Sequence, residues 1–509
     1  MRPIPATMAT QHPDNAGAPW WKGDAFIATQ DEIEELLLLF RELPIDEYMW
    51  DWEGKYVDEA VGEKLFSRAD DFFRKHPLGE AFRLTYRIPA FDGDAMHRMA
   101  RAFMNVLSLA DLARDIGLPH APVTELFLPL TTSAEQPLRV RQAFREVAEF
   151  HRAVFHRDRA EEDALLGQMD VTPLVEDVAS LFSIENILRP YWETLLKEKQ
   201  NIRTEGQRLF LARSDPAMNA GLVPAVLAVK VALSAASETA QSLGFPLYPI
   251  LGTGSLPFRG SVNPQYTDVF LRQYGGVRTY SIQSAFRYDY PLEEVRHALE
   301  EIRREAPLRE VQPVPAADRA KLRELAEMFT SIWQPTIEAI AGTINAVAAH
   351  IPSRRERLQH IGLFGYSRGV GKVRLPRAIG FTAALYSLGV PPELIATGRG
   401  LLCAKEAGLF DLVERYYPAL RDDLTHAGKY LNRENLHILA GEQVAFADIE
   451  RGVDAVEEAL DIELGPRKPR HLIHRNLTSI ILQRLRSNAS REAIVRDVTE
   501  AGVIRRSLG

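Results

Sequence analysis

Two carboxylates along this 509-residue chain have the type and spacing needed to bind a metal ion. Glu176 directly follows the apolar run at residues 171–175, and Asp215 follows the run at residues 208–211 after a short polar segment. If these runs are neighbouring strands, the two carboxylates could share Mg²⁺ or Mn²⁺ and leave part of its oxygen shell open to water and substrate. Taken alone, Asp215 could equally be a helix N-cap, a role that aspartate commonly fills.

Four arginines stand beside glycines or at the ends of apolar runs: Arg87, Arg259, Arg287 and Arg368. Arg259 lies in the segment GTGSLPFRGS at residues 252–261. Its glycines permit close approach of backbone to a ligand, and a guanidinium offers a planar fork suited to phosphate or carboxylate. Each arginine could instead be a surface residue paired with one of the 69 acids. Convergence on one metal-bearing face would predict a small polyanionic substrate.

His12 lies in the turn-prone segment TQHPDN, where Pro13 fixes φ and the following Asp and Asn can bond to nearby backbone. An imidazole titrates near neutral pH, so His12 could act as an acid, a base or an electrostatic stabiliser. It could equally be an exposed histidine on an N-terminal arm. The residues around it do not decide between these two interpretations.

Short apolar or β-branched runs, each ended by polar or glycine residues, alternate with helical patterns. Such alternation predicts a parallel sheet with functional groups at the carboxyl ends of the strands. We therefore predict an α/β fold of helix-rich (β/α)₈ TIM-barrel type with additional helices, and an open doubly wound sheet is the alternative. Only seven strands are predicted, so the barrel requires an eighth that the pattern does not reveal. The predicted strands are residues 84–88, 125–130, 171–175, 208–211, 247–251, 279–282 and 360–364.

Apolar residues at helical spacing predict several long helices. Ile33, Leu36, Leu37 and Phe40 form one stripe, which Asp31 could cap and which ends before a proline. No repeat or low-complexity linker divides the chain, so we predict one domain over residues 1–509, with a barrel core at roughly 80–400 and a helical C-terminal elaboration. The other predicted helices are residues 223–240, 316–349, 375–388 and 472–487.

The composition excludes several classes of protein. A net charge of −8 argues against nucleic acid or an anionic membrane as a partner. The single cysteine, Cys403, excludes an intrachain disulfide and a cysteine-cluster metal site. The start of the chain does not have a secretory signal pattern, and no apolar stretch approaches the ~20 residues that span a bilayer. These features predict a cytoplasmic protein.

Seven segments together resemble the signature blocks of archaeal-type phosphoenolpyruvate carboxylases. They occur in order between residues 9 and 380, and each would be weak evidence by itself. The blocks are ATQHPDN, MWDWEGK, TYRIP, LPLTTSAEQ, GTGSLPFRGS, QSAFRYD and LFGYSRGVGKVRLPRAIG.

The resemblance implies an enzyme that converts phosphoenolpyruvate and bicarbonate to oxaloacetate and phosphate with Mg²⁺ or Mn²⁺, usually as a homotetramer. It implies that His12 is catalytic and that Glu176 and Asp215 are the metal ligands. Arg259 and Arg287 match phosphate-binding arginines of the larger bacterial and plant carboxylases. Arg87 and Arg368 match more loosely and complete the predicted substrate-binding set.

The implied chemistry assigns a step to each group. The arginines would stabilise phosphoryl transfer to bicarbonate, which forms carboxyphosphate and a metal-bound pyruvate enolate. His12 would then accept the carboxyphosphate proton, or stabilise that anion, as CO₂ is released for attack by the enolate. This mechanism requires the N-terminal segment to fold back over the carboxyl face of the barrel. Residues 369–371 and 506–509 are candidates for segments that close the site.

The chain departs from the larger carboxylases at two positions. Met218 stands where they carry a lysine, and Thr253 stands where they carry the first of two arginines, so phosphate contacts at these positions do not transfer. Two other functions stay open. One is a phosphoenolpyruvate lyase, mutase or phosphotransferase on a similar barrel, and the other is a non-enzymatic relative that has kept the fold.

Overall fold

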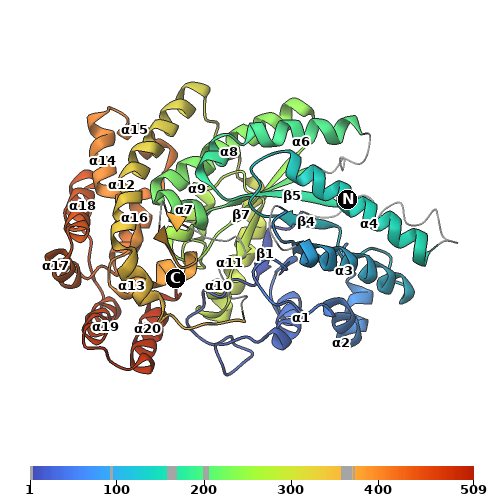
Figure 1. Cartoon of the computed structure of the whole chain (residues 1–509), viewed down its shortest axis with the longest axis horizontal. Coiled ribbons are helices and arrows are strands. Elements are labelled where there is room, and N and C mark those ends of the chain that lie inside the picture. Colours follow the sequence, from blue (N-terminus) through green and yellow to red (C-terminus); the bar gives the residue numbers. More distant parts are fainter. Residues whose placement is uncertain (1–3, 92–95, 157–168, 199–205, 357–368, 371–372) are drawn as a thin grey trace.

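The computed structural model describes residues 4–91, 96–156, 169–198, 206–356, 369–370 and 373–509. Eight parallel strands close into a barrel in the order of the sequence, β1 to β8, with β1 hydrogen-bonded to β8 (Figure 1). The predicted (β/α)₈ barrel is confirmed, and the open doubly wound sheet is excluded. The strands are β1 (Thr7–Thr10), β2 (Glu47–Asp51), β3 (Arg83–Arg87), β4 (Glu125–Leu128), β5 (Asp170–Val175), β6 (Gln207–Ala212), β7 (Leu247–Gly252) and β8 (Thr279–Ile282).

Six of the seven predicted strands are β3 to β8. The seventh, residues 360–364, lies outside the described residues, and the barrel closes without it. The prediction missed β1 and β2, so the barrel begins at residue 7 and not near residue 80. The last barrel strand ends at residue 282, whereas the predicted barrel core extended to about residue 400. β1 (TMAT) and β2 (EYMWD) are buried along their whole length, but polar residues at both ends of each strand leave no continuous apolar run for the sequence pattern to reveal.

Helices follow the strands and surround the barrel (Figure 1). The helix after Asp31 is present, but the Asp31 carboxylate accepts from Ala28 N and does not cap that helix. The other four predicted helices are also present, with ends shifted by a few residues. The helices of this part are α1 (Glu32–Glu42), α2 (Val61–Lys75), α3 (Met96–Asp115), α4 (Glu135–Phe155), α5 (Val178–Phe182), α6 (Glu185–Lys197), α7 (Ser214–Ala220), α8 (Leu222–Leu243), α9 (Thr267–Gln273), α10 (Ser284–Tyr288) and α11 (Leu292–Glu305).

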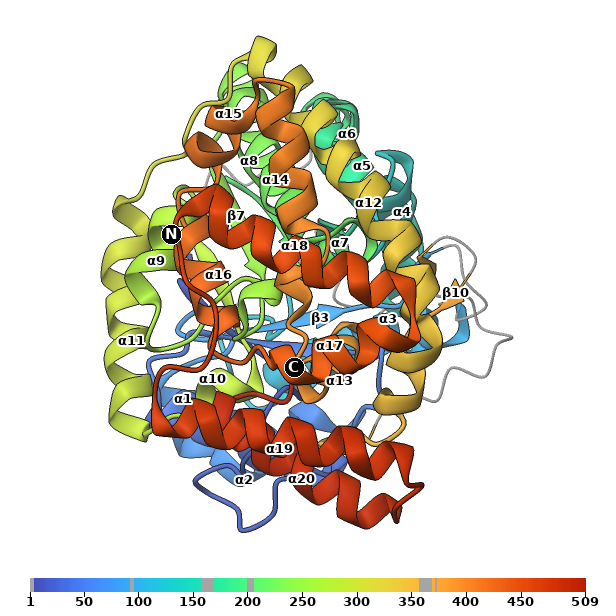
Figure 2. The ribbon, with the colours of Figure 1, turned by 90° about the vertical axis from the view of Figure 1, so that its left-hand side faces the viewer.

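The helices after α11 form a separate layer with its own apolar cluster, which also includes side chains of α7 and α8. In Figure 2 this layer lies in front of the barrel. Arg377, Ala378 and Ile379, at the start of α13, line the same pocket as residues from the strand ends, so the layer covers the carboxyl end of the barrel. The helices are α12 (Ala316–Ala348), α13 (Ala378–Ser387), α14 (Thr397–Glu406), α15 (Phe410–Tyr416), α16 (Leu420–Gly428), α17 (Arg433–Glu442), α18 (Val444–Leu460), α19 (Pro469–Arg486) and α20 (Arg491–Arg505).

The barrel interior consists of an apolar layer and a charged layer. The apolar layer lies next to the pocket, because two of its residues, Leu174 and Phe210, also line the pocket. Nearer the amino ends of the strands, Arg208 donates hydrogen bonds to Glu47 at 2.7 and 3.0 Å and to Glu125 at 2.9 Å. All three are buried, so each charge depends on the others for compensation.

Within the part of the chain that the structure describes, one helix has the length and apolar composition to cross a membrane. It is α8, and 89% of its most apolar window is buried inside the protein. A bent pair, Ala378–Ser387 with Pro392–Glu406, passes the same test as one broken span. Burial of this extent is typical of a core helix.

A buried charge network joins the N-terminal half of the barrel to the segment after α12. Glu35 of α1 accepts hydrogen bonds from Arg355 at 2.5 and 2.8 Å and from Arg287 at 3.1 Å. Tyr48 and Tyr288 also donate to Glu35, and its side chain has no exposed surface. Burial opposes ionisation, but the two guanidinium groups outweigh it and lower the pKa of Glu35 to about 2.

We expect Glu35 to make the stability of the fold depend on acidic pH. Because its pKa is depressed in the folded state, its contribution is complete above the unfolded pKa near 4.5 and is lost as the pH falls toward 2. Glu35→Gln should cost about 3–5 kcal/mol at pH 7, because it removes the carboxylate that pairs with buried Arg287 and leaves buried Arg355 with Glu32 alone. Denaturant unfolding between pH 3 and 7 measures both effects, with Glu34→Gln on the exposed face of the same helix as the control. Equal pH dependence in the two variants would contradict the assignment.

Candidate active site

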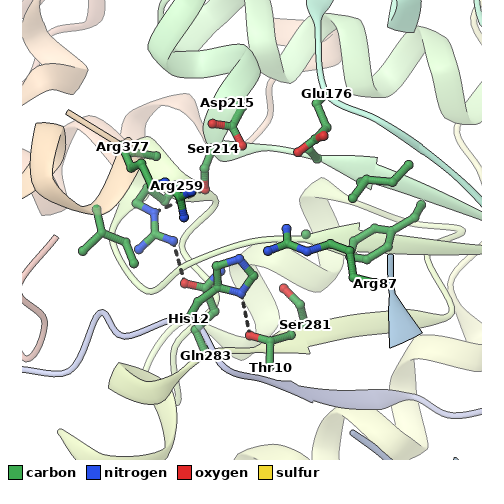
Figure 3. A pocket seen from close by; sticks show the side chains of 16 residues that line it. Thr10, His12, Arg87, Glu176, Ser214, Asp215, Arg259, Ser281, Gln283 and Arg377 are labelled. Atoms are coloured by element: carbon green, nitrogen blue, oxygen red, sulfur yellow. Dashed lines mark hydrogen bonds between the residues drawn. The ribbon is translucent and has the colours of Figure 1, made fainter. Parts of the chain in front are cut away.

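A polar pocket lies at the carboxyl ends of the barrel strands, where (β/α)₈ enzymes place their active sites. It brings together five residues predicted from the sequence, namely His12, Arg87, Glu176, Asp215 and Arg259 (Figure 3). The other lining residues are Thr10, Leu174, Phe210, Ala212, Ser214, Gly252, Ser281, Gln283, Arg377, Ala378 and Ile379.

His12 follows strand β1 by two residues, so it belongs to the barrel itself. The N-terminal segment therefore does not fold back over the carboxyl face as an arm, which corrects the sequence-based expectation. The side chain is half-buried, and its Nδ1 lies 3.0 Å from Thr10 Oγ1. This contact fixes the ring plane and leaves Nε2 on the opposite edge of the ring.

Glu176 directly follows β5, and its side chain is largely buried. Its Oε2 accepts a hydrogen bond of 2.9 Å from the backbone N–H of Leu130, in the loop after β4. Leu130 has a φ of 53°, which is uncommon for a residue with a side chain. The loop conformation thus directs a backbone donor at this carboxylate and restricts its orientation.

Asp215 is the second residue of α7, and its carboxylate lines the pocket. The N-cap position of this helix is Arg213, so the N-cap interpretation of Asp215 does not hold. Figure 3 places the carboxylates of Asp215 and Glu176 on one side of the pocket, with His12 and Arg87 opposite. Two carboxylates from neighbouring strand ends suit a hard divalent cation.

Arg87 ends strand β3 and is held by Asp51 at the end of β2. Its Nε and Nη2 donate to the two Asp51 oxygens at 2.9 and 2.6 Å. Burial lowers the pKa of Arg87, but Asp51, with a further contribution from Glu176, raises it above its ordinary value. Arg87 is therefore a fixed cation at the edge of the pocket.

Arg259 is buried, and four different acceptors surround its guanidinium. It donates to Ser214 Oγ at 3.2 Å, Asp14 Oδ2 at 3.2 Å, Gln283 Oε1 at 2.5 Å and the Gly509 carbonyl at 2.6 Å. A Cβ on Gly254 would lie 2.6 Å from the Arg259 Cζ. The glycine therefore admits the guanidinium, whereas the sequence suggested that it admits a ligand.

Residues 507–509, part of the segment 506–509 that was predicted to close the site, lie against it, and closure itself stays a prediction. All three are buried, and Leu508 N donates to the Asp14 carbonyl at 2.7 Å. A Cβ on Gly509 would lie 2.2 Å from the carbonyl oxygen of Ile379, a pocket-lining residue. In this structure the segment is docked, and it connects α20 to Arg259.

Two of the predicted substrate-binding arginines are not placed in the pocket by the described structure. Arg287 is fully buried in the Glu35 network and donates to the carbonyls of Ile282 and Thr10 at 3.0 Å. Its guanidinium is engaged by Glu35, a residue distant in the sequence, and Arg287 is not among the residues that line the pocket. Arg368 lies outside the described residues, as does residue 371 of the predicted closing segment 369–371, whose first two residues form the short strand β9 (Gly369–Val370).

Arg377 lines the pocket and was not singled out by sequence reasoning. It stands at the N-cap position of α13 and reaches toward Gly54, whose Cβ would lie 2.9 Å from its Nη1. The sequence feature that could have indicated Arg377 was its position in the block LPRAIG.

The two departures from the larger carboxylases, Thr253 and Met218, are both buried. Thr253 donates from its backbone N to Ser281 Oγ at 2.8 Å, and Met218 packs in the second apolar cluster.

A fully buried carboxylate, Asp14, connects these parts. Its Oδ1 accepts from Ala285 N at 2.7 Å, and its Oδ2 faces Arg259. Burial raises the pKa of Asp14, and Arg259 opposes that rise. Asp14 therefore positions the segment after β1, the start of α10 and Arg259 relative to one another.

Fold and pocket together are those of a (β/α)₈-barrel enzyme with carboxylates and arginines at the strand ends. The family model described as phosphoenolpyruvate carboxylase matches residues 4–509. A phosphoenolpyruvate carboxylase of Metallosphaera sedula is 38% identical over the full length of both chains. The carboxylase of Leuconostoc mesenteroides is 36% identical over 95% of each chain, and that of Caldivirga maquilingensis is 38% identical over 85% of this chain and 84% of its own.

The chain therefore belongs to the phosphoenolpyruvate carboxylase family, and its resemblance to the archaeal-type enzymes is confirmed. The comparisons support an enzyme that carboxylates phosphoenolpyruvate. The same comparisons argue against the alternative that this chain is a non-enzymatic relative that has kept the fold.

Proposed function

We propose that the pocket at the carboxyl end of the barrel converts phosphoenolpyruvate and bicarbonate to oxaloacetate and phosphate through carboxyphosphate and the enolate of pyruvate. The main support is the convergence of two carboxylates, three arginines and a histidine on one pocket. Opposite charges placed in this way suit a metal ion together with an anionic substrate.

Glu176 and Asp215 are the proposed ligands of Mg²⁺ or Mn²⁺. Their oxygen donors fit such a hard cation, and as two ligands they leave positions for substrate and water. The bound ion supplies Lewis-acid stabilisation of developing negative charge. The hydrogen bond from Leu130 N to Glu176 supports this assignment, because metal-binding carboxylates need fixed orientation.

Arg87, Arg259 and Arg377 are the proposed phosphate-binding groups. In the first step a bicarbonate oxygen attacks phosphorus and the bond to the enol oxygen breaks, giving carboxyphosphate and the pyruvate enolate. Guanidinium groups already held by Asp51 and Asp14 stabilise the transferring phosphoryl group without reorganising. Arg287 takes a positioning role in this proposal, because it holds the carbonyl of Thr10, whose hydroxyl contacts His12.

His12 is the proposed proton acceptor. Loss of the carboxyphosphate proton accompanies cleavage of its C–O bond to the phosphate, which releases CO₂ and phosphate. The methylene carbon of the enolate then attacks CO₂ and forms oxaloacetate. Exclusion of water matters at this stage, because protonation of the enolate gives pyruvate instead. The covering helices and the docked residues 507–509 support such exclusion.

A coupled assay tests the proposal directly. Purified protein with phosphoenolpyruvate, bicarbonate and Mg²⁺ should produce oxaloacetate, measured as NADH loss with malate dehydrogenase. Product formation should require bicarbonate and no nucleotide, which separates a carboxylase from a phosphotransferase. Absence of NADH loss with either metal would refute the proposal.

We also propose that the protein is a cytoplasmic homotetramer. Analytical sedimentation tests the oligomeric state, and cell fractionation tests the location.

Arg377→Gln should raise the KM for phosphoenolpyruvate by about tenfold, because a hydrogen bond to a charged group contributes roughly 1.5–3 kcal/mol. Folding should be retained, since the side chain lies at the pocket rather than in an apolar core. Gly54→Ala, which pushes against Arg377 from the opposite side, should raise KM by less. Steady-state kinetics measure both effects, and an unchanged KM in Arg377→Gln would remove this residue from the site.

A further inference from the structure

A second group of potential metal ligands lies outside the pocket, at the ends of α3 and α4. Asp111 belongs to α3, His151 to the last part of α4, and His156 is the C-cap residue of α4. Their candidate ligand atoms all lie within 4.8 Å of one another. The mechanism proposed above uses none of these residues.

The geometry of this group is convergent. The Nε2 atoms of His151 and His156 lie 3.3 and 3.0 Å from the same oxygen, Oδ2 of Asp111. Zinc–ligand bonds of about 2.0–2.2 Å at tetrahedral angles place neighbouring ligand atoms about 3.3 Å apart. Small adjustments of the histidine rotamers would therefore bring all three atoms to bonding distance of one ion.

The orientation of the Asp111 carboxylate and the two helix ends suit a cation at this position, although the charge of nearby Arg114 opposes one. The other oxygen of Asp111, Oδ1, lies 3.3 Å from Arg114, so the carboxylate is oriented with Oδ2 toward the imidazoles. The site lies at the carboxyl ends of two helices, where the helix dipoles favour positive charge. The His151 side chain is 7% exposed, whereas Asp111 and His156 are 21% and 17% exposed, so an ion could enter from solvent.

The helices of a (β/α)₈ barrel run antiparallel to its strands, so the carboxyl ends of α3 and α4 lie near the amino ends of the strands. In Figure 1 both helices lie on the side away from the C-terminal layer that covers the pocket. The group is thus at the opposite end of the barrel from the candidate active site.

We propose that Asp111, His151 and His156 form a second metal site, selective for Zn²⁺ or a similar transition-metal ion over Mg²⁺. Two imidazoles and one carboxylate are a ligand set typical of zinc and poorly suited to Mg²⁺, which prefers oxygen. The ion links α3 to α4 across a packed helix pair and stabilises the amino end of the barrel. Because the ligands come from two helices, binding favours the folded chain over the unfolded one.

The test uses full-length protein without a histidine tag, stripped with a chelator and dialysed against Zn²⁺ in excess Mg²⁺. Elemental analysis and calorimetry should give one tightly bound Zn²⁺ per chain, and Zn²⁺ should raise the melting temperature. His151→Ala combined with His156→Ala should weaken this binding at least tenfold and abolish the melting shift. His97→Ala, an exposed histidine on α3, is the matched control and should behave as wild type.

Two further variants keep the result interpretable. Asp215→Asn removes the proposed active-site ligand and should still bind Zn²⁺, which separates this site from the catalytic one. His156→Gln keeps a polar side chain beside Asp111 if the double variant fails to fold, and it should also bind at least tenfold more weakly. Absence of bound Zn²⁺ in the wild type, or equal affinity in wild type and His156→Gln, would show only a hydrogen-bonded cluster and overturn the proposal.

Discussion

Replacing His12 with asparagine is expected to reduce oxaloacetate formation by about 10²–10⁴-fold, the usual contribution of a general base. The first step, phosphoryl transfer to bicarbonate, does not depend on this base and should continue. The variant should therefore hydrolyse phosphoenolpyruvate to pyruvate in a bicarbonate-dependent reaction. Parallel assays coupled to malate dehydrogenase and lactate dehydrogenase separate the two products.

The comparison with Thr10→Val makes this experiment sharper. Thr10 orients the imidazole through Nδ1 but does not itself accept the proton in the proposed mechanism. Its loss should lower carboxylation less than the loss of His12, with little change in KM for phosphoenolpyruvate. Near wild-type carboxylation by His12→Asn would show that the base is another group.

Asp215→Asn is expected to abolish metal-dependent turnover. A metal ion acting as Lewis acid supplies several kcal/mol of stabilisation to the transition state, and each 1.36 kcal/mol corresponds to a factor of ten. A loss of about three orders of magnitude in kcat/KM should follow. Calorimetric titration with Mn²⁺ in a buffer without Mg²⁺ should show that the variant binds Mn²⁺ more weakly at the active site than the wild type does.

A nearby acid provides the matched control for this variant. Asp177 follows Glu176 directly, but its carboxylate accepts from Ser180 N and caps α5. Asparagine is an equally good cap, so Asp177→Asn should retain folding, Mn²⁺ binding and activity. Normal Mn²⁺ affinity in Asp215→Asn, or an equal loss in Asp177→Asn, would contradict the assignment of Asp215 as a specific ligand.

The barrel could be predicted from the sequence because six of its strands are short apolar or β-branched runs ended by polar residues. It failed at β1 and β2, which include Thr, Glu and Asp residues and are buried throughout. The sequence pattern detects apolar or β-branched runs, and the polar residues interrupt such a run in these two strands; burial does not distinguish them, because β4 and β8 are also buried along their whole length. Their assignment came only from closure of the barrel, in which β1 pairs with both β2 and β8.

For the site, the sequence determined which side chains could do chemistry and that Glu176 and Asp215 follow neighbouring strands. Tertiary structure decided which of them meet. Arg259 and Arg287 look alike in the sequence, as guanidinium groups near glycine or polar turns. Glu35 draws Arg287 into the buried network, whereas Asp14 and Gly509 hold Arg259 at the pocket.

His12 and Arg377 show the same division. The chemistry of His12 was evident from its residue type, but its place at a strand end required β1 to be part of the barrel. Arg377 entered the site only because the C-terminal layer covers the carboxyl end of the strands. Residue type and local burial are properties of short segments, whereas the direction of a charged side chain depends on partners that are distant in the sequence. That is why the sequence determined the ingredients of this site, and only the folded chain decided their arrangement.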